Sequence, residues 1–432
     1  MCFTEQGNYN IKLKYKGFEV NFVANVILNN PIISANFTDE NLTVNMFNLT
    51  TMQLSYEINK TDQTKPTTSS YYFESNNSLV ARVNGENLEI LSCGTATISL
   101  VVDGNKVDEL FITVINKEIN YISNLSQFLA IKNKPNSNYV VTNNLDFTSF
   151  TYDDSFNFGG EIDFNGKTIS NLKTPMFKTI ENAAVVKNIV VSGVLNLDVS
   201  DYYNESTNPT AYYSLIAFEN NGTINNLKFD NFEFNLLNKN SVDPTTVSLV
   251  VTTNNGVVSN ITLTNFEFNA NFSSSKVAGV IYSGLVNTNN GEILAVTGNA
   301  TYLGFTRISG VALYNYNKIA DVTLSQTFNV TQSKNQIGVL SYRCMPVNDK
   351  NPEISNINLT TTVNNTKTLT FAGFVYDASE ITINNVKLSF TFNGDYNDET
   401  TFLIYKTVSD SNVDYSKFEI VETNKNFEYA GI

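Results

Sequence analysis

Residues 224–234 read INNLKFDNFEF, and residues 258–268 repeat the same pattern as VSNITLTNFEF. In both stretches an Asn follows an apolar residue by two positions, and apolar residues then alternate with polar ones. Alternation with period two is typical of β-strands. Short alternating strands that return along a chain are typical of a solenoid whose repeats stack on one another.

The Asn of this phrase occurs six times, and two degenerate copies carry Ala295 and Asp321 at its position. Most of these positions lie 26 to 38 residues apart. One coil cannot bury its inward apolar residues alone, whereas stacked coils bury them against the same positions above and below. Backbone hydrogen bonds then run along the stack, at about 4.8 Å per coil. The sequence therefore predicts a parallel β-helix of about eight coils over residues 118–432.

The repeated Asn is expected at a corner of each coil, because Asn tolerates the left-handed backbone conformation. Its amide can also bond the next Asn of the stack, which predicts a buried structural Asn ladder interrupted at Ala295 and Asp321. The predicted ladder residues are Asn171, Asn188, Asn226, Asn260, Asn356 and Asn385. The apolar residues expected to point inward beside them are Leu172, Ile189, Leu227, Ile261, Ile357 and Val386.

The first third of the chain has hairpin spacing instead of this repeat. Residues 11–15 and 18–22 alternate around Lys16 and Gly17, and residues 96–102 and 110–114 do so around Asp103 and Gly104. Turn residues between two alternating strands predict antiparallel pairing. Residues 125–131 form the main exception to the all-β pattern, and we expect a short helix there that caps the open apolar end of the stack.

Two resemblances follow from particular stretches. FESNNSLVARV at residues 73–83, Gly85, and GTATI at residues 94–98 resemble the last strands of a bacterial group 2 immunoglobulin-like (Ig-like) domain, which would occupy residues 29–117. Residues 7–20 resemble the final hairpin of another such domain, so residues 1–28 would be its remnant. Residues 139–172 resemble the start of right-handed parallel β-helix regions in bacterial surface proteins. Together they imply an all-β chain, with an Ig-like β-sandwich before a right-handed β-helix.

Composition removes several classes of function. The net charge is −14 and only three Arg occur, which argues against nucleic acid and against anionic membrane surfaces as partners. The absence of His removes Ser-His-Asp and Cys-His nucleophile systems and the common His-based zinc sites. No run of eighteen apolar residues occurs, so we expect no membrane insertion in this fragment.

Asn supplies much of the polarity, with 67 of the 432 residues. Three Cys cannot form a four-cysteine metal site or a dense disulfide framework. The N-terminus lacks the basic and apolar regions of a signal peptide. We expect a chain excised from a longer protein, with the signal and the wall anchor outside it.

Few residues are candidates for chemistry or binding. Tyr202, Tyr203, Tyr212 and Tyr213 lie in a polar insertion and are predicted to form a stacking platform for sugars or a protein contact site. Asp395, Asp398 and Glu399 are weak candidates for Ca²⁺ binding, because hard cations prefer oxygen ligands. No catalytic residue, resident metal or cofactor is predicted.

These observations favour a non-enzymatic adhesin at the bacterial cell surface. The Ig-like stalk would present the β-helix to glycans or cell-surface proteins. Two alternatives remain open at this point. One is a carbohydrate-active enzyme, a polysaccharide lyase or hydrolase, whose carboxylates assemble only in the fold. The other is a structural coat or sheath subunit, because open sheet edges template assembly.

Overall fold

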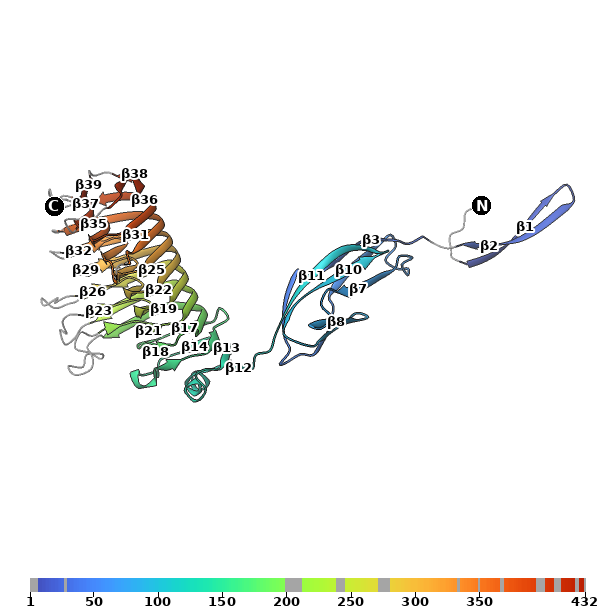
Figure 1. Cartoon of the computed structure of the whole chain (residues 1–432), viewed down its shortest axis with the longest axis horizontal. Helices are drawn as coiled ribbons and strands as arrows, with labels where there is room; N and C mark the ends of the chain where they lie inside the picture. The colour runs from blue at the N-terminus through green and yellow to red at the C-terminus, as the bar shows by residue number, and fades with distance from the viewer. Residues whose placement is uncertain are drawn as a thin grey trace. The chain divides into compact units, whose positions relative to one another are not determined.

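The computed structural model describes most of the chain. The described residues are 7–26, 29–198, 212–237, 245–270, 280–331, 335–348, 350–365, 369–393, 401–407, 413–423 and 427–430. The described part is all-β, apart from a few short helices, and it separates into two compact units at residues 1–118 and 119–432 (Figure 1). The first unit thus ends one residue after the boundary proposed from the sequence.

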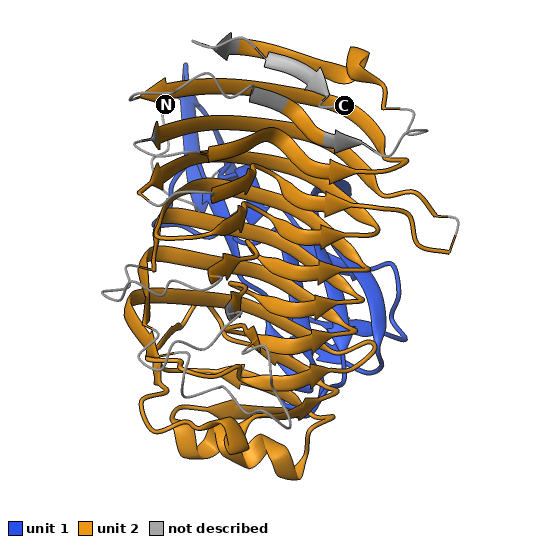
Figure 2. Ribbon diagram, turned by 90° about the vertical axis from the view of Figure 1, so that its left-hand side faces the viewer, with its two compact units in different colours: residues 1–118 blue, residues 119–432 orange. Residues whose placement is uncertain are grey.

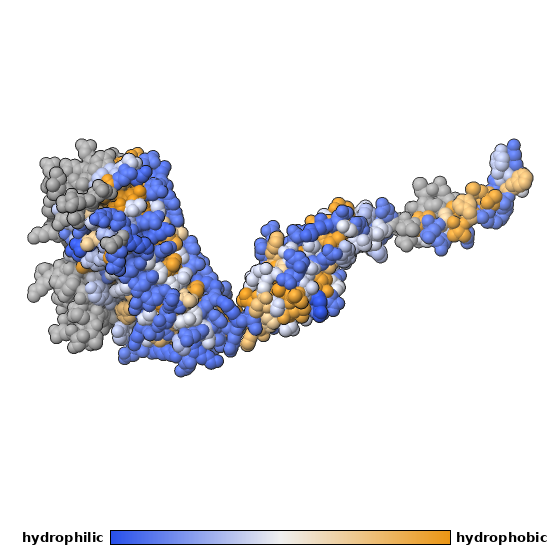
Figure 3. Space-filling model, viewed as in Figure 1, coloured by the Kyte–Doolittle hydropathy of each residue, from blue (hydrophilic) through white to orange (hydrophobic). Residues whose placement is uncertain are grey.

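The chain begins with an antiparallel hairpin of β1 (Gly7–Tyr15) and β2 (Phe18–Val26). Lys16 and Gly17 adopt positive φ angles of 46° and 86°, as a two-residue hairpin turn requires. Alternation places Ile11 opposite Phe22 and Leu13 opposite Val20, so one face of this ribbon is apolar. Leu13 is 58% exposed, and the apolar residues of the hairpin are visible at its surface in Figure 3.

The rest of the first unit contains short, mainly antiparallel sheets. Its strands are β3 (Ile32–Phe37), β4 (Asn41–Asn45), β5 (Thr51–Gln53), β6 (Tyr56–Lys60), β7 (Tyr71–Ser75), β8 (Ala81–Asn84), β9 (Asn87–Ile90), β10 (Gly94–Val102) and β11 (Asn105–Ile115). The sheet orders are β4-β11-β10-β7, β5-β9-β8 and β3-β6. The predicted hairpin around Asp103 and Gly104 is the β10–β11 pair. Alternating side chains such as Ile98, Leu100 and Ile112 form one core between the sheets.

The second unit starts with β12 (Ile119–Ile122), helix α1 (Leu125–Leu129) and the 3-10 helix η1 (Ala130–Asn133). Asn124 caps α1, because its side-chain oxygen accepts a hydrogen bond from the Gln127 N–H at 3.0 Å. Phe128 is fully buried, and its ring lies 5.1 Å from that of Phe147. These helices lie at one end of the stack in Figure 2, where a cap was expected.

Two long parallel sheets build the body of the second unit. The thirteen-stranded sheet contains β12, β13 (Asn138–Val141), β14 (Leu145–Asp146), β16 (Glu161–Asp163), β17 (Thr168–Ser170), β19 (Val185–Asp198), β22 (Thr223–Leu237), β25 (Val257–Asn269), β28 (Glu292–Leu303), β31 (Lys318–Val330), β34 (Glu353–Asn365), β36 (Thr382–Asn393) and β38 (Phe418–Thr423). Each neighbouring pair from β19 to β38 is parallel, so successive turns of the chain lie one above another (Figure 2).

The fifteen-stranded sheet is made mostly of short strands. They are β15 (Phe156–Phe158), β18 (Phe177–Ile180), β20 (Tyr212–Tyr213), β21 (Ala217–Asn220), β23 (Thr245–Val247), β24 (Val251–Asn254), β26 (Val280–Tyr282), β27 (Val286–Asn289), β29 (Arg307–Ser309), β30 (Ala312–Asn315), β32 (Asn335–Gly338), β33 (Ser341–Cys344), β35 (Leu369–Ala378), β37 (Thr401–Thr407) and β39 (Phe427–Ala430). Two further 3-10 helices are η2 (Tyr152–Asp154) and η4 (Tyr415–Lys417).

This sheet has two rows of short strands, which β35 joins because it pairs with both β32 and β33. The long strands of the other sheet bend without being interrupted. In β22, for example, Asn226 and Asn231 have left-handed φ angles of 56° and 48°. Parallel repeats of this kind are consistent with a solenoid.

The predicted inward column is confirmed at its centre. Ile189 pairs with Leu227, Leu227 with Ile261, and Ile357 with Val386. Val296 and Val322 fill the gap between Ile261 and Ile357, as the degenerate copies of the phrase required. All seven side chains are at most 1% exposed, and they belong to one continuous core. Leu172 is also buried, but it lies outside this column, because it follows β17 and β17 pairs with Val190 and Val191.

Candidate functional site

The Tyr insertion is only partly covered by the described residues. Tyr202 and Tyr203 lie outside them. Tyr212 is 37% exposed, whereas Tyr213 is 1% exposed and its hydroxyl donates to the Leu172 carbonyl at 2.9 Å. The Tyr213 ring packs 5.6 Å from that of Phe234. The expectation that Tyr213 offers its ring to a ligand is therefore wrong, because alternation along β20 turns this side chain into the core.

The acidic candidates Asp395, Asp398 and Glu399 also lie outside the described residues. Among the residues that the structure does describe, no group of three His, Cys, Asp or Glu side chains could hold a metal ion. The other acid-rich pair, Asp153 and Asp154, lies in η2. Asp154 accepts hydrogen bonds from the Thr151 N–H and hydroxyl, both at 2.9 Å, and these bonds lower its pKa. Its hydrogen bonds are those of a helix cap.

The predicted Asn ladder is present as a column of corners. Asn188, Asn226, Asn260, Asn356 and Asn385 all have left-handed backbone, and so do Ala295 and Asp321, the two predicted interruptions. Asn226 donates to Asn188 at 2.7 Å and Asn385 donates to Asn356 at 3.1 Å, whereas Asn260 donates to Asn225 instead.

The expected burial of this ladder is wrong, because Asn188 is half-buried and the other four Asn are exposed. Asn171 does not belong to the column. Strand β17, which ends just before Asn171, pairs with Val190 and Val191, beyond the corner at Asn188, and the Asn171 amide donates to Asp146. A different set of Asn forms a buried ladder.

Asn220, Asn254, Asn289 and Asn315 have no exposed surface, and each amide donates to the next oxygen at 2.7 to 2.8 Å. They come from the Asn-Asn-Gly phrases 220–222, 254–256 and 289–291 and from the related Asn315 position. Cys344 occupies the next position of the column, and burial raises its pKa to about 12. This ladder fixes the register of the fifteen-stranded sheet below the surface site described next.

A group of Tyr and Arg side chains comes from five strands of this sheet on neighbouring coils; its Tyr342 and Tyr376 are buried, at 6% and 5% exposure, and its other members are half-buried. We call it the Tyr–Arg cluster, and it consists of Arg307, Tyr314, Gln336, Tyr342, Arg343, Tyr376 and Asp377. The strand register brings it together: Tyr314 pairs with Arg343, Arg343 with Asp377, and Arg307 with Gln336. Two of the three Arg of the whole chain lie here.

Gln336 is the centre of the hydrogen bonds in this cluster. Its amide nitrogen donates to the Tyr376 hydroxyl at 3.0 Å. Its amide oxygen accepts from the Tyr342 hydroxyl at 3.1 Å and from Arg307 Nε at 3.2 Å. One side chain thus fixes two phenols and one guanidinium, which reduces the conformational entropy that a ligand would have to overcome.

The aromatic rings and the Arg307 guanidinium of the cluster also pack against one another. Tyr342 and Tyr376 stack with their centroids 4.5 Å apart and an interplanar angle of 14°. The Arg307 guanidinium lies over the Tyr342 ring, 4.2 Å from its centroid. Leu313 and Ala372 are buried in one hydrophobic cluster with these two rings. Burial raises the pKa values of Tyr342 and Tyr376, so both phenols stay protonated at neutral pH.

Arg343 follows Tyr342 on β33 and pairs with Tyr314 of the preceding coil. Its Nε donates to Asp377 at 3.0 Å, and its guanidinium lies 5.9 Å from the Tyr314 ring centroid. Tyr314 stacks in turn on Tyr316, with an interplanar angle of 10°. Arg307, Tyr314, Tyr316 and Arg343 are half-buried, so part of each side chain reaches solvent. The cluster offers cationic donors beside aromatic rings, and it can recognise a ligand without a proton-transfer pair.

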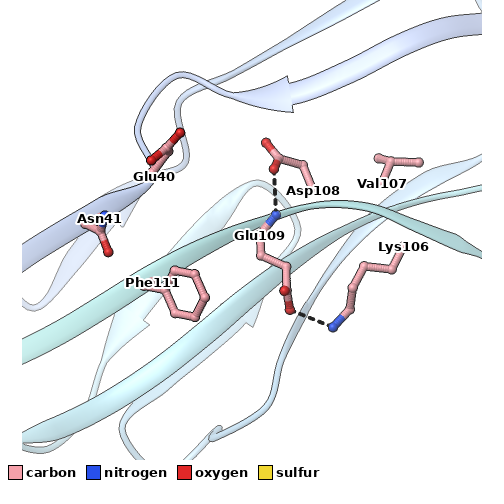
Figure 4. A pocket seen from close by; sticks show the side chains of 7 residues that line it. All are labelled: Glu40, Asn41, Lys106, Val107, Asp108, Glu109 and Phe111. Carbon is pink, nitrogen blue, oxygen red and sulfur yellow. Dashed lines mark hydrogen bonds and ion pairs between the residues drawn. The ribbon is translucent and has the colours of Figure 1, made fainter.

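The first unit has a hollow of about 460 Å³ lined by charged residues of β11 and its neighbour (Figure 4). Lys106 pairs with Glu109 at 2.7 Å. Asp108 accepts from the N–H groups of Phe37 and Glu109, at 2.7 and 2.9 Å. Its two carboxylate oxygens therefore already stabilise the backbone of the first unit, which leaves this hollow less suited to binding than the Tyr–Arg cluster.

Sequence reasoning missed this cluster. Alignment on the corner positions does not bring its residues together, because Tyr314 lies 7 residues before Asp321 whereas Arg343 lies 13 residues before Asn356. The pairing appears only in the strand register. The longest helix among the described residues is α1 with five residues, and none of them could span a bilayer. A search of protein-family profiles found no match, and no curated protein matches the chain significantly.

Proposed function

We propose that this chain is a non-enzymatic extracellular surface protein of adhesin type. In this proposal residues 29–117 form a bacterial Ig-like sandwich that acts as a spacer, and residues 118–432 form a right-handed β-helix of about eight coils. The β-helix presents its side to glycans or to cell-surface proteins. Residues 1–28 are the last hairpin of a preceding Ig-like domain, whose apolar face would pack against the rest of that domain.

The observation that supports binding is the pre-organised Tyr–Arg cluster. Tyr rings supply large contact area with only two torsions to freeze, and Arg recognises planar oxygen groups through two parallel N–H donors. Both Arg side chains are held by an Nε hydrogen bond and lie near a Tyr ring. Because these groups are already ordered, binding would cost less entropy than on mobile surface side chains.

The chemistry of the cluster favours binding over turnover. Glycoside hydrolysis ordinarily needs two carboxyl groups on either side of one glycosidic bond. The cluster contains one carboxylate, Asp377, and Arg343 neutralises it at 3.0 Å. Burial raises the pKa values of the Tyr342 and Tyr376 phenols, so both stay protonated at neutral pH and neither is available as a general base.

Glycan-array binding of the whole chain, followed by product analysis with the bound glycans, tests this proposal. We expect retention of glycans without new reducing ends. Tyr314→Ala should weaken retention, while Tyr121→Ala serves as the matched control because Tyr121 is 60% exposed on β12. Release of oligosaccharides would contradict this proposal and favour the alternative, a carbohydrate-active enzyme. If Tyr314→Ala and Tyr121→Ala weaken glycan binding equally, the Tyr–Arg cluster is not the binding site.

A further inference from the structure

We infer that the Tyr–Arg cluster takes an acidic glycan, one whose sugar rings carry carboxylate or sulfate groups. This inference rests on the proposed function and names its ligand class. It starts from donors that the fold leaves unused. Arg307 and Arg343 each make their hydrogen bond through Nε. Within the part of the chain that the structure describes, no hydrogen bond occupies the Nη groups of either residue.

The orientation of these donors is set by the protein. Gln336 holds Arg307 at one edge while the Tyr342 ring supports its face, and Asp377 holds Arg343 in the same manner. A guanidinium fixed at Nε keeps its Nη edge for a further partner, and that edge matches the two oxygens of a carboxylate or sulfate. The two Arg lie on successive coils, which are about 4.8 Å apart along the stack.

The local charge of the cluster is opposite in sign to that of the whole chain. Arg307 and Arg343 contribute two positive charges and Asp377 one negative charge, so the cluster has a net charge of +1. The whole chain has a net charge of −14. The cluster can therefore attract an anionic ligand although the chain as a whole is acidic.

The aromatic part of the cluster favours a sugar over other anions. The C–H face of a pyranose packs on an aromatic ring, and Tyr314 with its partner Tyr316 gives two parallel rings next to Arg343. A flexible acidic peptide lacks such flat apolar faces. Nucleic acid would need more clustered cations than two Arg, because its affinity depends mainly on phosphate contacts. An acidic polysaccharide presents acidic groups and ring faces together, which matches the position of Arg343 beside Tyr314 and Tyr316.

The test compares polymers that differ only in charge. Calorimetry with the whole chain uses polygalacturonate and the same polymer fully methyl-esterified, together with chondroitin sulfate and poly-glutamate. We expect polygalacturonate or chondroitin sulfate to bind at least about tenfold more tightly than the esterified polymer, since each charge-assisted hydrogen bond contributes that much. Polygalacturonate carries carboxylates alone, whereas chondroitin sulfate carries carboxylates and sulfates, so binding of chondroitin sulfate without binding of polygalacturonate would indicate that sulfate is required.

Variants locate the site. Arg307→Gln should weaken binding of the preferred acidic polymer about tenfold or more, while Arg82→Gln in the first unit should leave it unchanged. Because Arg343→Gln leaves Asp377 unpaired, the double variant Arg343→Gln/Asp377→Asn gives a neutral pair that should fold and still lose affinity. Melting temperatures equal to that of the unaltered protein confirm that these variants are folded.

The outcomes separate the two proposals. Equal affinity for the charged and esterified polymers overturns the acidic-glycan inference but leaves a glycan-binding protein. Tighter binding of poly-glutamate overturns the inference in favour of an acidic protein partner. Loss of affinity in Arg82→Gln equal to that in Arg307→Gln overturns the site. Binding of no polymer in calorimetry, with an empty glycan array, counts against both proposals.

Discussion

Asn254 and Asn289 are 35 residues apart in sequence, yet the Asn254 amide donates to the Asn289 side-chain oxygen at 2.8 Å in a place without solvent. The Asn254 oxygen in turn accepts from Asn220 at 2.7 Å. Each buried amide therefore depends on the coils on both sides of it. A buried polar group that loses its partner keeps its full desolvation cost, which makes this column sensitive to single substitutions.

We predict that Asn254→Leu lowers the free energy of unfolding by about 2–4 kcal/mol, because the Asn220 amide keeps only its bond to the Val257 carbonyl and the Asn289 oxygen loses the amide that donates to it. The adjacent residue provides the control. Asn255 is exposed and bonds Asn221 at 2.9 Å, so Asn255→Leu should cost under about 1 kcal/mol. Urea denaturation of the whole chain measures both, and equal costs would show that burial does not matter for this ladder.

The cap of the stack gives a second prediction. Phe128→Ala should cost about 3–5 kcal/mol, because the ring is fully buried and contacts Phe147, Phe156 and Phe177. Thermal melting followed by far-ultraviolet circular dichroism measures the change. Tyr121→Ala removes an exposed aromatic residue of the preceding strand and should shift the midpoint little. If Phe128→Ala melts like Tyr121→Ala, the helix does not stabilise the stack.

The close approach of neighbouring coils at Gly291 gives a third prediction. A Cβ at Gly291 would lie 2.0 Å from the carbonyl oxygen of Gly256 on the preceding coil. Gly291→Ala must therefore push two coils apart, and we expect a cost of about 1–3 kcal/mol. At Gly7 a Cβ would meet only the Tyr9 ring, at 3.8 Å, so Gly7→Ala is the control. A urea midpoint unchanged by Gly291→Ala would contradict this close approach.

Thiol reactivity gives a fourth prediction. Burial raises the pKa of Cys344 to about 12, whereas Cys93 is exposed. In a Cys2→Ser variant, a thiol reagent at pH 8 should label Cys93 rapidly and Cys344 only after denaturant is added. Because the folded pKa exceeds the unfolded value of about 8.5, this thiol should reduce stability as the pH rises above that value. Rapid native labelling of Cys344 would show that the core opens.

Much of the second unit could be predicted from the sequence. The corner positions 226, 260, 295 and 321 were recognisable because their flanking residues keep the same apolar alternation in every coil. Left-handed backbone follows at each of them, even where Ala295 or Asp321 replaces Asn. Such local patterns determine which residues face the core, and stacking places the same positions inward in each successive coil.

Burial of the Asn columns could not be predicted in the same way. Asn226 and Asn220 both belong to repeated phrases, and both bond an Asn of a neighbouring coil. Only the fold shows that one column lies at an exposed corner and the other inside the sheet. Similarly, Tyr212 and Tyr213 are adjacent in sequence, and alternation along a two-residue strand decides which ring is buried.

The Tyr–Arg cluster was hidden because its residues extend from Arg307 to Asp377. Segments between strands differ in length from coil to coil, so equal sequence spacing does not identify the neighbours. Each pair became visible through strand register, such as Tyr314 with Arg343. Repeat alignment with these segments removed would place Tyr314, Arg343 and Asp377 at one position of successive coils.

The parallel register of the long sheet has a mechanical consequence. Covalent bonds run around each coil, while the hydrogen bonds between β25, β28 and β31 run along the axis of the stack. A pulling force along that axis loads one interface at a time and detaches coils from an end, whereas a sideways force must shear every bond of an interface together. The stack should therefore extend in steps under axial load, dissipating work coil by coil, and remain stiff against transverse load.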